Sequence, residues 1–194
     1  MVSPELERAV AYSALAILLV GAGVTDALRG KIYNALTYPA VALGLIEHTL
    51  FGGLPGGAGH LGLAGSAMGL AVGFLPMFLL WMAGGVGDGD AKLMAGVGAL
   101  GGWRFALATM FYGLIAAFVM AIVVMIRHRV VKRTLARLWR FVWLSLAMRK
   151  SPLPTTADSP KVPLGLAFSI GAAAALLEVL AAALGHRGGG LLGF

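Results

Sequence analysis

Two carboxylates and an ammonium group follow directly on a long apolar run near the middle of the chain. Residues 84–94 read Gly-Gly-Val-Gly-Asp-Gly-Asp-Ala-Lys-Leu-Met, and the apolar run over residues 61–83 is long enough to cross a bilayer. Charged groups are costly at such a place, so they indicate a functional site. The glycines let the backbone leave helical geometry, and Asp90 is placed to cap a helix over residues 91–100. The alternative interpretation is a polar loop with a capping aspartate.

Asp26 is the second acid that favours a functional interpretation, because it ends the first apolar run, over residues 9–25. Two carboxylates within a few ångströms of each other cannot both ionise easily, so such a pair holds one proton. The ionised member can take a proton from water while the protonated member polarises or protonates a scissile amide. This chemistry needs neither a metal nor a covalent intermediate.

The composition excludes a soluble enzyme and several kinds of chemistry. Hydrophobic residues make up 59% of the 194 residues and charged residues only 12%, whereas soluble proteins have about 25% charged residues. The chain has no cysteine, so disulfides, thiolate metal sites and a cysteine nucleophile are excluded. No spacing of histidines and acids resembles a metal site, and no cofactor is expected.

We predict an all-α membrane protein, a polytopic bundle of about six transmembrane helices in a single domain over residues 1–194. The fourth hydrophobic segment has only twelve residues, fewer than the about 17 to 25 of an ordinary span, so it could tilt, thin the bilayer or re-enter. In the third segment, glycines recur every four residues and predict close helix packing at Gly65, Gly69 and Gly73. The six segments cover residues 9–25, 35–51, 61–83, 91–102, 103–126 and 162–184.

The basic residues predict the orientation. With the N-terminus outside, the loops after the first, third and fifth segments are cytoplasmic and hold all of the 15 lysines and arginines except Arg8, Arg104 and Arg187. These loops include a basic amphipathic segment over residues 127–150 and a proline-rich loop over residues 151–161. Membrane lipid and orientation therefore explain the net charge of +7, and nucleic acid is not expected as a partner.

Three separated motifs resemble those of a known family. Asp26 precedes Ile-Tyr-Asn, which ends at Asn34; residues 87–93 read Gly-Asp-Gly-Asp-Ala-Lys-Leu; and residues 161–167 read Lys-Val-Pro-Leu-Gly-Leu-Ala. In this order they resemble the motifs of type IV prepilin peptidases, the bacterial members of the intramembrane GxGD aspartic proteases. That family has an Asp followed by I-P-N, then G-x-G-D-x-K-L, then K-[IV]-P-x-G-x-A. Here Tyr33 stands where the family usually has proline.

The resemblance implies that Asp26 and Asp90 are the catalytic pair, forming a dyad at the cytoplasmic face. Residues 85–88 also spell G-x-G-D, but they lack the following x-K-L and match the motif less well. The positions expected to bind substrate or shape the site are Asn34, Gly87, Asp88, Gly89 and Lys92. The resemblance implies no cofactor and no metal.

The resemblance also implies the reaction and its location. The expected activity is removal of the short basic leader of a type IV prepilin or pseudopilin, of the Flp type, at the cytoplasmic face of the bacterial inner membrane. The chain resembles the short form of the family, without the cysteine-containing N-terminal segment associated with methyl transfer, so cleavage without N-methylation is expected. The oligomeric state is not predicted. The alternatives are a small ion- or proton-coupled transporter that uses the aspartates as ion ligands, and a non-catalytic assembly factor.

Two further acids, Glu47 and Glu178, lie in predicted spans away from this site. Counting from Asn34 and Lys161 places them about 20 and 25 Å away at 1.5 Å per residue, nearer the outer face. We expect packed or interfacial acids there, with His48 as a local partner of Glu47.

Overall fold

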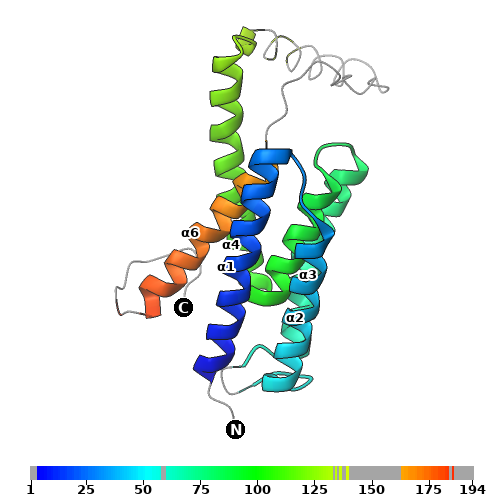
Figure 1. Ribbon diagram of the computed structural model, residues 1–194, viewed down its shortest axis with the longest axis vertical. Helices are drawn as coiled ribbons and strands as arrows, with labels where there is room; N and C mark the ends of the chain where they lie inside the picture. The colour runs from blue at the N-terminus through cyan, green and yellow to red at the C-terminus, as the bar shows by residue number, and fades with distance from the viewer. Residues whose placement is uncertain are drawn as a thin grey trace. The chain divides into compact units, whose positions relative to one another are not determined.

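The chain is helical in a computed structural model (Figure 1), which describes residues 4–57, 60–132, 134, 136, 139, 163–183 and 185. Apart from one isolated bridge between Gly57 and His60, every regular element in this part of the chain is a helix. The prediction of an all-α protein is confirmed for these residues. The helices are α1 (Pro4–Arg29), α2 (Asn34–Gly52), α3 (Gly62–Met82), α4 (Asp88–Arg127) and α6 (Leu164–Ala183).

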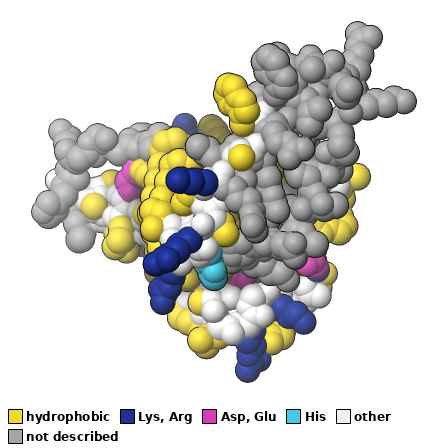
Figure 2. Space-filling view, turned by 90° about the horizontal axis from the view of Figure 1, so that it is seen from above, with side chains coloured by type: hydrophobic (Ala, Val, Ile, Leu, Met, Phe, Trp, Pro, Cys, Tyr) yellow, Lys and Arg dark blue, Asp and Glu magenta, His cyan; other side chains and the backbone are white. Residues whose placement is uncertain are grey.

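Four of these helices are long and apolar enough to cross a membrane. They also expose large hydrophobic side chains, such as Ile17 and Leu79, and Figure 2 shows patches of such side chains on the surface. Exposed apolar surface of this kind is unfavourable in water and is expected against lipid tails. These are the features of a helical membrane protein, while the count of six spans stays a prediction. The four candidate spans are Glu5–Arg29, Gly62–Met82, Asp88–Arg127 and Leu164–Ala182.

The chain divides into two compact units. The larger comprises residues 1–116 and 163–194, and the smaller comprises residues 117–162. The smaller unit contains the end of α4. The predicted amphipathic segment, 127–150, lies largely outside the described residues, and the proline-rich loop lies wholly outside them.

Within the larger unit, α1 packs against α2 and α6, and α2 packs against α3 (Figure 1). The first part of α4 is the most deeply buried segment, because Leu93, Met94, Val97 and Leu100 are all 0–1% exposed. It contacts all three preceding helices through small residues. Gly96 faces Leu18 of α1 and Ala40 of α2, Ala99 faces Gly44 of α2, and Gly98 faces Gly69 of α3.

The short fourth hydrophobic segment ends at a break inside α4. Gly102 has φ 78° and ψ 178°, a conformation that glycine adopts at little cost and other residues avoid. Residues 88–101 therefore form a helical piece separate from residues 103–127, which agrees with the short segment predicted over residues 91–102. Because neighbouring helices enclose this piece, it does not need the length of a lipid-facing span.

The glycine stripe of α3 is the place where α4 approaches most closely. A Cβ atom added at Gly69 would lie 2.1 Å from the carbonyl oxygen of Gly98, and one at Gly73 would lie 2.2 Å from that of Met94. At Gly65 the added atom would meet only the side chain of Leu61. The predicted packing role thus holds for two of the three glycines.

Candidate active site

Asp26 lies in the last turns of α1, which continues to Arg29 instead of ending at Asp26 as expected. It is only 8% exposed, and its Oδ2 accepts a hydrogen bond of 2.9 Å from the backbone N–H of Leu166. Leu166 belongs to the first turn of α6, where backbone N–H groups have no acceptor within the helix. Asp26 therefore caps the start of a helix that is 140 residues away in the sequence.

Asp90 lies in the first turn of α4, which begins at Asp88 and so starts earlier than the predicted Ala91. It is 7% exposed, and its Oδ2 accepts a hydrogen bond of 3.1 Å from the backbone N–H of Gly87. An acid in the first turn that reaches back to this N–H forms half of a capping box. The prediction that Asp90 caps this helix is confirmed, and capping uses only one of its two oxygens.

Ile32, in the link between α1 and α2, is the residue at which the three motifs meet. A Cβ atom added at Gly89 would lie 3.0 Å from Ile32 Cβ, and one at Gly165 would lie 2.5 Å from Ile32 Cδ1. The same added atom at Gly165 would lie 2.9 Å from Asp26 Oδ2. The starts of α4 and α6 therefore both approach this link, α4 with Asp90 beside Gly89 and α6 with Gly165 beside Asp26.

A second set of polar contacts lies beside Asp90. Lys92 Nζ donates hydrogen bonds of 3.0 Å to Asn34 Oδ1 and to Asp88 Oδ2, which ties the start of α2 to the start of α4. The Asp88 side chain is 68% exposed, in contrast to the buried Asp90. The two aspartates of the overlapping G-x-G-D motifs therefore differ in their surroundings. Asp90 is buried, whereas Asp88 is exposed and paired with the ammonium group of Lys92.

Tyr33 keeps the backbone conformation that proline would give. Its φ of −84° and ψ of 137° lie in the extended region that proline also adopts. The side chain makes an additional contact, because Arg29 Nη1 donates a hydrogen bond of 2.9 Å to its hydroxyl oxygen. The backbone at this position is therefore one that the proline usual in the family could also adopt.

Three groups that shape this site were not predicted from the sequence. They are the side chain of Ile32, the backbone of Gly165, which has no side chain, and the N–H group of Leu166. Ile32 and Gly165 belong to motifs that were identified in the sequence, but the contact between these motifs is visible only in the folded chain. The one available signal was Gly165 in the third motif, since a residue without a side chain permits close approach of another segment.

Replacing Gly165 by alanine is expected to lower the activity of the protein by about 10- to 100-fold, because the new methyl group displaces Ile32 or the Asp26 carboxylate. Cleavage of a prepilin, the substrate that the family resemblance implies, measures this loss. Gly85→Ala is the matched control, since its Cβ atom would meet nothing nearer than 3.4 Å. Equal activity of the two variants would mean that the approach of α6 to Asp26 is unimportant.

Another polar cluster lies near the start of α1, 19 residues before Asp26, or about 28 Å along a helix. Glu7 is 3% exposed and contacts Nδ1 of His48, at 2.5 Å, and Nδ1 of His60. Glu47 is buried too, and its Oε1 lies 3.7 Å from Nε2 of His48, which is thus a local partner of Glu47 as expected. The hydrogen bond of His48 Nδ1 is with Glu7. Within the described residues, no three potential ligands are arranged to hold a metal ion.

Glu178, the other acid away from the site, accepts a hydrogen bond of 2.7 Å from the hydroxyl group of Tyr112. Tyr112 lies on α4 and Glu178 on α6, so this bond joins two helices of the larger unit. The contact agrees with the expectation of a packed acid.

The fold and the buried aspartates define an all-helical membrane protein with a polar site at the start of two helices. The chain matches the type IV leader peptidase family over residues 13–125, more than half of its 194 residues. The protein therefore belongs to the type IV leader peptidase family, and the predicted relationship is confirmed. The matched region contains Asp26, Asn34 and Asp90 and ends before Gly165.

No curated protein and no solved structure matched the chain. Membership of this family makes the protein a peptidase, and it gives no support to an ion- or proton-coupled transporter.

Proposed function

We propose that the protein is an intramembrane aspartic endopeptidase in which Asp26 and Asp90 form the catalytic acid–base pair. The observation that carries this proposal is that two buried carboxylates, each held by a backbone N–H group, lie beside the three motifs that contact one another at Ile32. Both hydrogen bonds use Oδ2, so each carboxylate keeps Oδ1 for a water molecule or a substrate amide. The family match supports a leader peptidase activity.

In the proposed reaction the pair shares one proton, as closely spaced carboxylates do. The ionised aspartate takes a proton from a water molecule, and the water oxygen bonds to the carbonyl carbon of the scissile amide. The protonated aspartate donates its proton towards the carbonyl oxygen and stabilises the developing negative charge. When the C–N bond breaks, the leaving nitrogen takes the proton that the pair gained from water, and a hydroxyl group of the tetrahedral intermediate gives its proton to the pair as the new carboxyl group forms. The pair is then singly protonated again.

The proposed substrate is a type IV prepilin or pseudopilin of the Flp type, cut between its short basic leader and its hydrophobic helix. The proposed location of the site is the cytoplasmic face of the bacterial inner membrane, with the N-terminus of the peptidase outside. The support is the excess of basic residues in the loops on that side, which include Arg29 and Lys31 beside the site. Cleavage without methyl transfer to the new N-terminus is part of the proposal.

We propose that the residues around the pair shape the site and do not react. Lys92 holds Asn34 and Asp88 in place, and so fixes the link that carries Ile32 relative to the start of α4. Gly87 supplies the N–H group that orients Asp90, and Gly89 leaves room for Ile32. These contacts hold two carboxylates from distant parts of the chain in one geometry, which is the main requirement for acid–base catalysis.

The experiment that tests the proposed function is cleavage of a purified Flp-type prepilin by the purified protein in detergent. The expected products are the leader and the mature pilin with an unmodified N-terminus, identified by intact mass. Full cleavage in the presence of EDTA is also expected, because the proposed chemistry uses no metal. Inhibition of the folded protein by EDTA, or an uncut prepilin, would contradict the proposal.

A further inference from the structure

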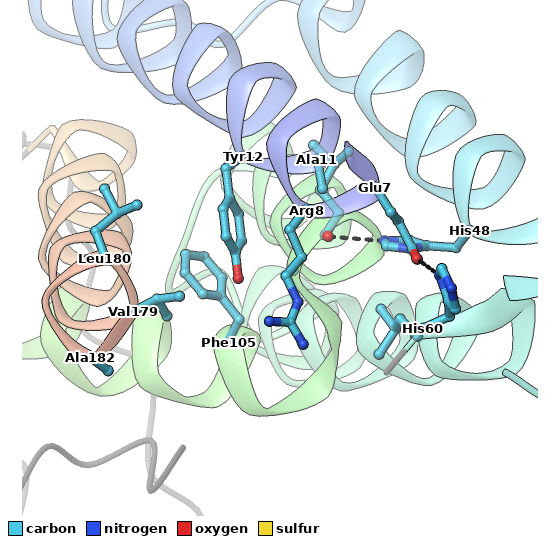
Figure 3. A pocket seen from close by; sticks show the side chains of 13 residues that line it. Glu7, Arg8, Ala11, Tyr12, His48, His60, Phe105, Val179, Leu180 and Ala182 are labelled. Carbon is cyan, nitrogen blue, oxygen red and sulfur yellow. Dashed lines mark hydrogen bonds and ion pairs between the residues drawn. The ribbon is translucent and has the colours of Figure 1, made fainter. Parts of the chain in front are cut away.

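A cavity of about 540 Å³ lies among the start of α1, the middle of α4 and the end of α6, at the end of α1 opposite Asp26 (Figure 3). Arg8 and Tyr12 extend into it from α1, and the Glu7–His48–His60 cluster forms its polar side. Apolar side chains complete the wall, among them Phe105 of α4 and Leu180 of α6. The cavity is thus polar on one side and apolar on the other, and no part of the proposed reaction uses it.

The negative charge of Glu7 is balanced inside the cluster. An ionised carboxylate only accepts hydrogen bonds, so Nδ1 of both histidines carries a hydrogen towards Glu7. Nε2 of His48 lies 3.1 Å from the carbonyl oxygen of Leu100, which is also only an acceptor, so it carries a hydrogen too. The proton shared by Glu7 and His48 makes the net charge of this pair zero, whichever of the two residues holds it.

Arg8 is therefore the source of the net positive charge in the cavity wall. It makes no ion pair or hydrogen bond with any residue that the structure describes. An arginine without a partner, beside the Tyr12 hydroxyl group, is suited to bind the oxygens of a phosphate. The cavity therefore favours an anion over a cation or a neutral polar molecule.

The depth of the cavity in the membrane indicates which kind of molecule carries the anionic group. Residues 7 and 8 lie about 28 Å from Asp26 along α1, close to the about 30 Å thickness of the hydrocarbon core. With Asp26 at one edge of the membrane, Arg8 lies at the opposite headgroup layer. Phospholipid phosphates lie at this depth, and their acyl chains extend towards the apolar wall formed by Phe105, Val179 and Leu180.

We propose that this cavity binds one anionic phospholipid, with its phosphate on Arg8 and Tyr12 and part of an acyl chain against the apolar wall. The bound lipid contacts α1, α4 and α6, which are three of the four helices that line the cavity; the fourth is α2, through His48. The ligand class is a phosphodiester with an apolar chain, and a water-soluble phosphate without that chain is bound much more weakly.

The test is native mass spectrometry of the full-length protein, delipidated in an uncharged detergent and titrated with dioleoyl phosphatidylglycerol or dioleoyl phosphatidylcholine. We expect one phosphatidylglycerol molecule to bind at least about tenfold more tightly than phosphatidylcholine, and Arg8→Gln to remove about that tenfold preference. Ala182→Phe, which fills part of the cavity without changing charge, is expected to weaken phosphatidylglycerol binding as well.

Arg104→Gln is the matched control, because Arg104 stacks on the Trp103 ring, 5.4 Å from its centroid, and does not line the cavity. It is expected to leave the preference unchanged. Equal loss in Arg8→Gln and Arg104→Gln would indicate general attraction of anionic lipid to the surface and would overturn the proposal. Displacement of the lipid by an equal concentration of glycerol phosphate would also overturn it, since the site would then bind a free phosphate.

Discussion

Replacing either Asp26 or Asp90 by asparagine is expected to lower prepilin cleavage by about 10²- to 10⁴-fold, the usual contribution of a general acid or base. Asparagine keeps the size of the side chain and an oxygen that can accept the N–H of Leu166 or Gly87, but it cannot exchange a proton. The loss should therefore appear in the rate of cleavage and not in the amount of folded protein. The gel shift of a co-expressed prepilin measures cleavage. The amount of peptidase in the same membranes, measured in parallel, shows whether the variant accumulates.

Asp88→Asn is the matched control for these variants, since Asp88 is two residues from Asp90 but is exposed and paired with Lys92. We expect it to keep most of the activity. A large loss in Asp88→Asn together with an active Asp90→Asn variant would move the catalytic position to the other G-x-G-D motif. Normal processing by the Asp26→Asn and Asp90→Asn variants would exclude the proposed mechanism.

Replacing Gly69 by alanine is expected to destabilise the protein by about 3 kcal/mol or more, because the added methyl group would lie 2.1 Å from a backbone oxygen of α4. That oxygen belongs to Gly98, and an added atom at Gly98 would lie 2.0 Å from the carbonyl oxygen of Gly69. Neither helix can relax by rotating a side chain. Thermal unfolding in detergent, followed by circular dichroism, measures the expected fall in stability.

Gly65→Ala provides the comparison, because Gly65 belongs to the same stripe but its new methyl group would meet only the flexible side chain of Leu61. We expect a change in stability of less than about 1 kcal/mol. Similar unfolding temperatures for the two variants would contradict the contact between α3 and α4. Since α4 positions Asp90, Gly69→Ala should also lower cleavage.

Much of the fold could be predicted from local features of the sequence. Runs of apolar residues indicated the helices, and glycines at 84, 85, 87 and 102 lie where the chain leaves helical geometry. The boundaries of the helices were harder to place, because polar residues such as Asp26 and Asp88 can belong to a helix when their side chains cap or pair. For this reason α1 ends later and α4 begins earlier than hydrophobicity indicated.

The candidate site was predicted as a set of motifs and not as a set of contacts. Asp26, Asn34, Asp90 and Lys92 were singled out from residue type and order, but the hydrogen bond from Leu166 to Asp26 joins residues 140 positions apart. No local pattern specifies such a contact. The Glu7–His48–His60 cluster was missed for the same reason, since its members come from α1, α2 and the link before α3.

The claim that Asp26 and Asp90 meet in one site can be measured by cross-linking. The chain has no cysteine, so the pair Asp26→Cys and Asp90→Cys can be introduced without further change and treated with a short bifunctional thiol reagent in native membranes. Ile32→Cys with Gly89→Cys is the positive control, because these positions are in contact, and Asp26→Cys with Glu7→Cys is the negative control. We expect a cross-link between positions 26 and 90 as efficient as that of the positive control. A yield no higher than that of the negative control would contradict it.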